Sequence, residues 1–139
     1  TQIERYMAKI SGPLMDRMDI HIDVPLVEFR KLRSRQNGDS SEQLRSRVQQ
    51  ARRIQSQRFE HPFMTNAMMG HKQVEKFCEL DSASEMLLRQ AMAEFALSAR
   101  AHDKICKVAR TIADLEGSES IQPAHLAEAV GYRKLDRKL

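Results

Sequence analysis

The sequence is poor in the residues that build hairpins, disulfide scaffolds and membrane spans. It contains no Trp, 5 Gly, 4 Pro and 2 Cys among its 139 residues, and no apolar run is longer than three residues. Runs this short exclude a membrane-spanning helix and a secretory signal within these residues. Cys78 and Cys106 form neither a CxxC pair nor a ligand cluster, which argues against a disulfide framework and favours a reducing compartment. We therefore expect a cytoplasmic protein without a membrane partner.

The residues that are plentiful favour helices. Hydrophobic residues make up 41% of the chain and aromatic residues only 5%, so aliphatic side chains and methionine must fill the core. A length of 139 residues suffices for one domain with an ordinary core. Charge is uneven, because residues 30–58 hold 9 basic and 2 acidic residues while the whole chain has a net charge of +4. This excess suggests an anionic partner, although solvated arginines are the commoner explanation.

Residues 19–24 have the alternation of apolar and polar residues that is typical of a β-strand, and Pro25 ends the pattern. No other segment has a convincing strand pattern, and a lone strand cannot satisfy its own backbone. It must pair with another molecule or with a sheet outside this sequence, and the start at Thr1 rather than methionine favours the second alternative. Without that sheet, we expect residues 1–39 to be largely mobile or to pair aberrantly between copies.

Helix signals dominate from residue 40 to about residue 131. Asp39 and Glu42 form a capping-box pattern that starts a helix running to about Phe59. The apolar stripe of this helix consists of Leu44, Val48, Ala51 and Phe59. Further helices are predicted for residues 2–9 before a break at Ser11-Gly12-Pro13, around residues 74–78, after caps at Asp81 and Ser98 (the latter ending at Gly117), and from Pro123 onward. The sequence therefore predicts a mainly α fold, a small helical bundle preceded by one orphan β-strand.

Several common catalytic and binding motifs are missing. The chain has no Gly-x-x-x-x-Gly-Lys-Ser/Thr loop, no Gly-x-Gly-x-x-Gly and no His-Glu-x-x-His, so nothing in it cradles nucleotide phosphates unaided. His102 and Cys106 lie one helical turn apart and could be two metal ligands. A closed metal site needs three or four ligands, so we interpret them as a partly buried pair and predict no metal site.

Two arginines have positions that could serve an anion. Arg100 falls in the first turn of the helix capped by Ser98, where free backbone N–H groups attract anions and a cation opposes the helix dipole. It shares a helix face with Lys104, Lys107 and Thr111. Arg17 stands between Asp16 and Asp19 at the start of the strand pattern. A solvated face for Arg100 and local pairing for Arg17 remain the alternatives.

The helix over residues 40–58 carries the basic excess. Arg45, Arg52 and Arg53 lie to one side of its apolar stripe, and Arg47 and Arg58 to the other. Arginines that flank a stripe in this way commonly cover a core with their alkyl stems. Contact with phosphate backbones is the alternative, but no interleaved aromatic residues support base stacking.

Two parts of this sequence resemble the bacterial magnesium-chelatase-like AAA+ ATPases, the YifB/ComM family. Residues 9–25 (KISGPLMDRMDIHIDVP) are similar to the end of the family's AAA+ core. Residues 97–101 (LSARA), 107–117 (KVARTIADLEG), 121–123 (IQP) and 132–133 (YR) are similar to its C-terminal magnesium-chelatase domain. Two positions depart from the family pattern, because Ala96 stands where glycine is usual and His102 where an aromatic residue is usual.

The resemblance implies a division of the chain and roles for both arginines. Residues 1–25 would be the tail of an AAA+ α/β core with its last strand, 26–39 a basic connector, and 40–139 the helical lid. A preceding part of a longer protein would carry a Lon-protease-like domain and the Walker A and B motifs. Arg17 would be an arginine finger that acts on the nucleotide of a neighbouring subunit. Arg100 would be the sensor-2 arginine, which touches the γ-phosphate.

The function implied for the longer protein is that of a ring-forming ATPase, expected to be a hexamer. Its cofactors would be ATP and Mg, and its expected role is a DNA branch-migration or helicase-type motor linked to competence and recombination. The present chain should bind neither cofactor tightly and should not hydrolyse ATP, because the Walker motifs are absent from it. The alternative is a non-enzymatic helical module that binds DNA or protein through basic residues 30–58, with Arg45, Arg52 and Arg53 as the DNA contacts.

Overall fold

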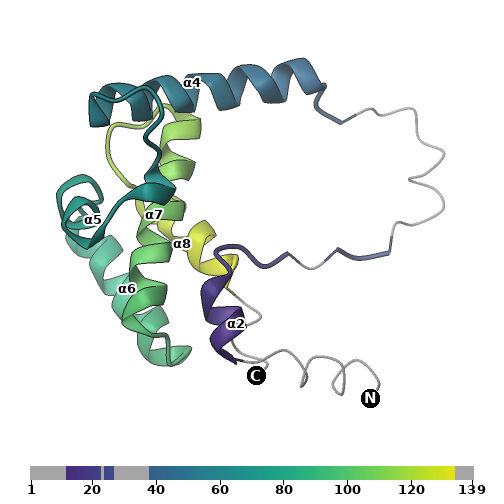
Figure 1. Cartoon of the computed structure of the whole chain (residues 1–139). Helices are drawn as coiled ribbons and strands as arrows, with labels where there is room; N and C mark the ends of the chain where they lie inside the picture. Colours follow the sequence, from purple (N-terminus) through teal and green to yellow (C-terminus); the bar gives the residue numbers. More distant parts are fainter. Residues whose placement is uncertain (1–11, 23, 27–37, 134–139) are drawn as a thin grey trace.

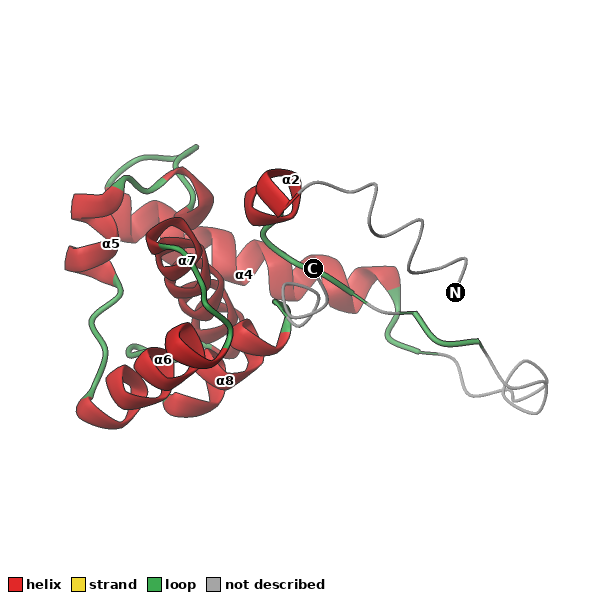
Figure 2. Ribbon diagram, turned by 90° about the horizontal axis from the view of Figure 1, so that it is seen from below, coloured by secondary structure: helices red, strands yellow, loops and turns green. Residues whose placement is uncertain are grey.

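A computed structural model of the chain describes residues 12–22, 24–26 and 38–133 (Figure 1). The elements of this part are α2 (Gly12–Arg17), α4 (Ser41–Phe59), the 3-10 helix η1 (Asn66–Met68), α5 (His71–Phe77), α6 (Ser82–Glu94), α7 (Ala99–Glu116) and α8 (Pro123–Gly131). The prediction of a mainly α fold is confirmed, and none of the described residues lies in a strand (Figure 2). The helix predicted over residues 2–9, connector residues 27–37 and residues 134–139 lie outside the described residues.

Helix α7 is the centre of the bundle, and α4, α5, α8 and η1 all pack against it (Figures 1 and 2). Its apolar buried face consists of Ala101, Ile105, Cys106, Ala109, Ile112 and Ala113. The small alanines let neighbouring backbones approach closely, while the larger side chains fill the space between helices. Leu126 of α8 is fully buried beside them, and α6 completes the core by packing on α8.

Local side-chain hydrogen bonds set where the helices begin. Asp81 accepts from the Ser84 N–H at 2.7 Å and Ser98 accepts from the Ala101 N–H at 3.2 Å, so both predicted N-caps are confirmed. The capping box of α4 differs from the prediction by one residue, since Ser40 is the N-cap and Gln43, not Glu42, returns the second hydrogen bond. An uncharged Ser/Gln pair makes the same reciprocal contacts as the predicted acidic pair, which explains the one-residue error.

Three helices end in a residue with positive φ. These residues are Glu60 (52°) after α4, Ala96 (48°) after α6 and Gly117 (72°) after α7. The next residue in each case donates its N–H to a carbonyl five residues earlier, at 3.2, 3.0 and 2.8 Å respectively. This is the Schellman geometry, which satisfies carbonyls at a helix end. At Ala96 the family's usual glycine would adopt this φ without the steric cost that a Cβ brings.

Helix α4 extends beyond the bundle at its N-terminal end (Figure 1). Leu44 and Val48 are 47% and 52% exposed, whereas Ala51 is only 4% exposed. The prediction of a continuous core stripe along this helix is therefore wrong for its first half. The periodicity is present, but the N-terminal end of α4 projects past the helices of the bundle, so Leu44 and Val48 remain about half exposed (Figure 1).

The N-terminal segment packs against the bundle in a way that the sequence did not predict. Gly12 and Pro13 open α2 instead of only ending a helix, because proline is tolerated in a first helical turn. The predicted strand over 19–24 is absent from its described residues, since no second described strand offers a ladder. Instead, the His21 N–H donates to the Tyr132 carbonyl at 2.8 Å, and Met15 and His21 are buried. These contacts tie the segment to the bundle, while the mobility expected for residues 1–39 stays a prediction.

Candidate functional site

The end of α2 meets the first turns of α7, and we call this contact the arginine corner. Its members are Asp16, Arg17, Ser98, Arg100 and Lys104. The Ser98 hydroxyl donates to Asp16 Oδ1 at 2.9 Å, and Lys104 Nζ donates to the Arg17 carbonyl. These contacts bring together two segments that are far apart in the sequence.

Arg17 is the last residue of α2, and its side chain is exposed. Its carbonyl is held by Lys104, but its guanidinium has no partner among the residues that the structure describes. The neighbouring carboxylates do not neutralise it, because Asp16 accepts from Ser98 and Asp19 pairs with Lys104 at 2.7 Å. The predicted alternative of local pairing for Arg17 is therefore not observed in the described part of the chain.

Arg100 is the second residue of α7, and its side chain is also exposed without a described partner. Ser98 satisfies the N–H of Ala101, while the other early N–H groups of a helix have no intrahelical acceptor. A guanidinium in the first turn beside such N–H groups is suited to an anion, because both carry positive charge. The arginine corner can therefore bind a negatively charged group of a partner molecule.

The other members of the predicted cationic face of α7 are engaged within the chain. Lys104 contacts Arg17 and Asp19, and Lys107 Nζ donates to the Ala67 carbonyl at 3.3 Å. The Thr111 hydroxyl donates to the Lys107 carbonyl at 2.8 Å. Of these four polar residues on the face, Arg100 is the one whose side chain has no described partner.

The arginines of α4 lie away from the arginine corner, at the opposite end of α7. Arg45, Arg52 and Arg53 are exposed and have no described side-chain partner, while Arg47 lies 3.7 Å from Asp39. Since Leu44 and Val48 are themselves exposed, Arg45 does not cover a packed core with its stem as the sequence suggested. The exposed arginines of α4 form a basic surface that is separate from the corner.

Arg58 has a different role from the other α4 arginines. Both of its terminal nitrogens donate to the carboxylate of Asp114, which is fully buried in α7, and one of them also donates to Asn66 Oδ1 at 2.9 Å. Asn66 Nδ2 and Arg110 Nε donate to the same carboxylate at 2.8 and 3.1 Å. We call Arg58, Asn66, Arg110 and Asp114 the buried network.

The buried network is structural, because every charged group in it faces another member or the backbone. Arg110 also donates to the carbonyls of Ser118 and Glu119 at 2.6 and 2.9 Å, which fixes the loop after α7. Burial lowers the pKa of Arg110 from its usual value, and the Asp114 carboxylate partly offsets this effect. Sequence reasoning missed this network because Arg58 and Asp114 are far apart in the chain and no local spacing links them.

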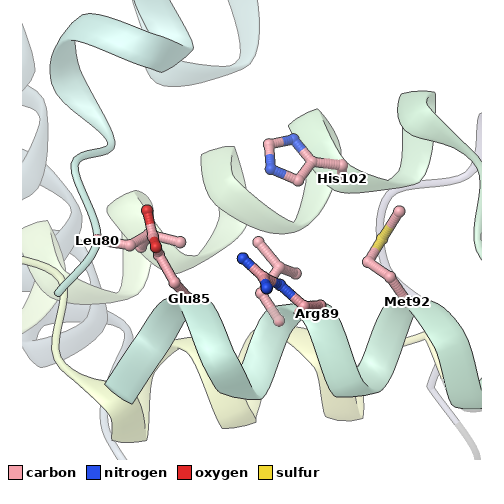
Figure 3. Close-up of a pocket in the computed structure, with 6 residues that line it drawn as sticks. Leu80, Glu85, Arg89, Met92 and His102 are labelled. Atoms are coloured by element: carbon pink, nitrogen blue, oxygen red, sulfur yellow. The ribbon is translucent and has the colours of Figure 1, made fainter. Parts of the chain in front are cut away.

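A cleft of about 340 Å³ lies between α6 and α7 (Figure 3). Its lining consists of Leu80, Glu85, Leu88, Arg89, Met92 and His102. Of the candidate ligand pair, His102 lines this cleft, and its Nε2 lies 4.0 Å from Sγ of the buried Cys106. Burial raises the pKa of the Cys106 thiol to about 12, which opposes formation of the thiolate that metals bind. Among the described residues, no group of three potential ligands surrounds a common point.

Comparison with known proteins covers nearly the whole chain. The sequence profile of the family described as magnesium chelatase, subunit ChlI C-terminal, matches residues 38–133, and that of magnesium chelatase, subunit ChlI, matches residues 1–32. The chain is 41% identical to the competence protein ComM of Haemophilus influenzae and 38% identical to the uncharacterized protein YifB of Escherichia coli, in each case over 99% of the chain. An uncharacterized protein of Mycobacterium bovis is 36% identical over 94% of it.

The chain spans only about a quarter of the length of these relatives, 26–27% in each case. No helix in the described part of the chain is both long enough and apolar enough to cross a membrane. The C-terminal profile covers the whole bundle from α4 to α8, which includes Ser98, Arg100 and Lys104 of the arginine corner. On this match, the chain belongs to the magnesium-chelatase family, with its helical bundle as the ChlI C-terminal domain.

Proposed function

We propose that this chain is the C-terminal lid region of a ring-forming AAA+ ATPase. Arg17 would act as an arginine finger on the nucleotide held by a neighbouring subunit, and Arg100 would act as the sensor-2 arginine. The observation that carries the proposal is that both guanidinium groups are exposed and without described partners at one corner of the fold. Family membership supports it, because the positions of both arginines match segments that resemble this family.

ATP and Mg would be bound mainly by other parts of the longer protein, because this chain has no phosphate-binding loop. The residues of the corner fit the terminal phosphate of such a nucleotide, since two free guanidinium groups and helix N–H groups suit a multiply charged anion. Mg and the phosphates supply the phosphoryl-transfer chemistry. Arg17 would stabilise the negative charge that develops on the transferring group, and Arg100 would report the state of that group to α7.

The partners in this proposal are neighbouring subunits of a ring, expected to be a hexamer. An arginine finger that serves a neighbour must project from the surface of its own subunit, and the exposure of Arg17 fits this requirement. Because Arg100 belongs to the same corner, one nucleotide at the subunit interface would contact both residues. A subunit on its own would then hydrolyse ATP slowly.

The test is steady-state ATPase kinetics of the full-length protein with Arg17→Ala and Arg100→Ala. Loss of an arginine finger lowers kcat by about 1,000-fold or more, so we expect a loss of that order for Arg17→Ala. Arg89→Ala is the control, because Arg89 is exposed on α6 and belongs to neither the corner nor the basic surface of α4. Wild-type kcat in the Arg17→Ala protein would contradict the proposal.

For the longer protein we propose a DNA branch-migration or helicase-type motor linked to competence and recombination. The printed name of the Haemophilus relative, competence protein ComM, supports the link to competence. The exposed arginines of α4 support contact with a DNA backbone, because Arg45, Arg52 and Arg53 are not engaged by described residues. The same surface supports the second candidate, a non-enzymatic module that binds DNA or protein through basic residues 30–58.

DNA binding by the chain can be measured by fluorescence anisotropy over a range of salt concentrations. Each phosphate contact contributes a salt slope of about 0.9, so reversing Arg45, Arg52 and Arg53 to Glu should reduce the slope by about 2.7. Arg89→Glu on α6 is the control, since Arg89 is exposed but distant in sequence from this surface. A slope that is unchanged by the triple reversal would remove α4 from the DNA-binding surface under both candidate functions.

A further inference from the structure

The segment that carries Arg17 is attached to the helical bundle by more than its covalent connection. Lys104, on α7, contacts this segment twice: its ammonium donates to the carbonyl of Arg17 and lies 2.7 Å from Asp19 Oδ1. The Lys104 side chain is only 17% exposed, so this cation lies at a packed contact. A cation on the last carbonyl of a short helix also complements the negative end of its dipole.

Arg133 makes a second attachment from the end of α8. It is 1% exposed, and its Nη1 donates to the Met18 carbonyl at 2.5 Å. Its Nη2 lies 3.8 Å from Asp16 Oδ1. The adjacent residue Tyr132 accepts from the His21 N–H at 2.8 Å. A buried guanidinium that donates to a backbone carbonyl fixes that carbonyl firmly, because losing the acceptor would leave a buried N–H donor unsatisfied.

We propose that Lys104 and Arg133 are positioning residues that hold the Arg17 segment to the bundle, so that Arg17 and Arg100 move as one rigid unit. This inference rests on the proposed function of the two arginines. Lys104 lies one helical turn beyond Arg100 on the same helix, and it contacts the carbonyl of Arg17 itself. A shift of α7 caused by an anion at Arg100 therefore reaches Arg17 without passing through a flexible connector.

We call the contacts of Lys104 and Arg133 with the Arg17 segment the clamp, and they would affect the rate of ATP hydrolysis. An arginine finger works only if its guanidinium is held close to the position that the reacting group demands, and a misplacement of about 1 Å can cost about 100-fold in rate. Arg17 ends a helix of 6 residues, which is too short to be rigid alone. The contacts from Lys104 and Arg133 supply the rigidity that α2 lacks.

The clamp can be tested on the present chain by amide hydrogen exchange at His21, whose N–H donates to Tyr132. Lys104→Met retains the alkyl stem and removes the donor, and it should speed exchange at His21 by about tenfold, as expected for losing a charged hydrogen bond. Exchange at Ala109 in the core of α7 should be unchanged. Lys107→Met is the control, because Lys107 lies on the same helix and donates to Ala67 rather than to α2.

The kinetic half of the test uses the full-length ATPase. Lys104→Met should lower kcat by about tenfold with little change in the KM for ATP, because Lys104 acts through Arg17 and does not touch the nucleotide. In an Arg17→Ala background the same substitution should cause no further loss, which a merely structural role would not produce. Lys104→Arg should restore most of the activity. Arg133→Lys, which keeps the charge in the buried site, should reproduce the kcat loss.

The possible outcomes separate this inference from the proposed function. Unchanged exchange at His21 in Lys104→Met, or losses in kcat that simply multiply with Arg17→Ala, would overturn the clamp. Wild-type activity of Arg17→Ala would instead overturn the arginine-finger assignment and the catalytic purpose of the clamp, while exchange at His21 would still report the contact itself. Thermal unfolding of each variant, followed by circular dichroism, distinguishes local release from global destabilisation.

Discussion

Replacing Asp114 with asparagine should be among the most destabilising conservative substitutions in this domain. The Asp114 carboxylate is fully buried and receives hydrogen bonds from Arg58, Asn66 and Arg110. The two arginine side chains are themselves only 14% and 4% exposed, so neither can turn to water when the carboxylate is neutralised. Breaking a buried ion pair from one side typically costs about 3–5 kcal/mol, chiefly because a charge is left unpaired.

A loss of about 4 kcal/mol would be a large part of the roughly 5–15 kcal/mol that stabilises a typical domain. For a bundle of this size each kcal/mol corresponds to about 4–8 °C, so the melting temperature should fall by about 20 °C. Urea denaturation followed by far-ultraviolet circular dichroism measures the free energy directly. Asp103→Asn is the matched control on the same helix, because its side chain is 25% exposed and pairs with histidines. That substitution should cost less than about 1 kcal/mol.

The reasoning would be refuted if Asp114→Asn cost no more than Asp103→Asn. A double-mutant cycle with Arg58→Met adds a second check. Because Arg58 donates to Asp114 through both terminal nitrogens, the double variant should be more stable than the sum of the single losses predicts, by about 1–3 kcal/mol. A coupling near zero would mean that the two side chains contribute independently.

Three further predictions concern local features of the fold. Ala96→Gly should stabilise the bundle by about 0.5–1 kcal/mol in urea denaturation, since removing the cost of positive φ outweighs the entropy of glycine; destabilisation would contradict the Schellman geometry. The hydrogen bond to Asp103 raises the pKa of His71 above 6.5, so this pair contributes stability below that pH and loses it as pH rises through the raised pKa. His71→Gln should therefore be less stable than wild type at about pH 5.5 and equal to it at about pH 8.5, and a pH-independent difference would oppose this. Burial raises the pKa of Cys78 from 9.0 to about 11 and of Cys106 to about 12, so iodoacetamide should label both at least about 100-fold more slowly in the native protein than in urea.

Local signals in the sequence were sufficient to predict much of the helical bundle. Asp81 and Ser98 cap their helices because the capping hydrogen bond spans only three residues, so the pattern is visible in the sequence. Gly117 ends α7 for an equally local reason, its positive φ. The burial of Leu44 and Val48 was predicted wrongly, because whether a stripe is covered depends on where a distant helix packs.

The site shows the same division between local and long-range information. The position of Arg100 in a first helical turn could be read from the sequence, and its exposure agrees with a role in anion binding. That Arg17 lies at the same corner could not be predicted from spacing, because Lys104 and Ser98 bring the segments together across the fold. Sequence reasoning placed Lys104 on the same face as Arg100 but did not assign it to the contact with α2.

The buried charges illustrate why composition alone misleads. The basic excess of residues 30–58 suggested an anionic partner, yet Arg58 is directed inward to Asp114 while Arg45 and Arg52 remain exposed. A buried arginine needs a carboxylate within contact distance, and here that carboxylate comes from another helix. Such a partner is visible only once the helices are packed. Arg133 is a second case, since its acceptors, Met18 and Asp16, lie at the other end of the chain.

The central claim is that Arg17 completes a catalytic site in a neighbouring subunit, and subunit mixing tests it most directly. One full-length variant would carry Arg17→Ala, and the other would carry an inactivated lysine in the Walker A motif. If Arg17 acts in trans, each variant alone is inactive, but the mixture regains ATPase activity because some interfaces pair an intact phosphate-binding loop with an intact Arg17. A mixture as inactive as its components would contradict action across the interface, and full activity of Arg17→Ala alone would contradict the catalytic role itself.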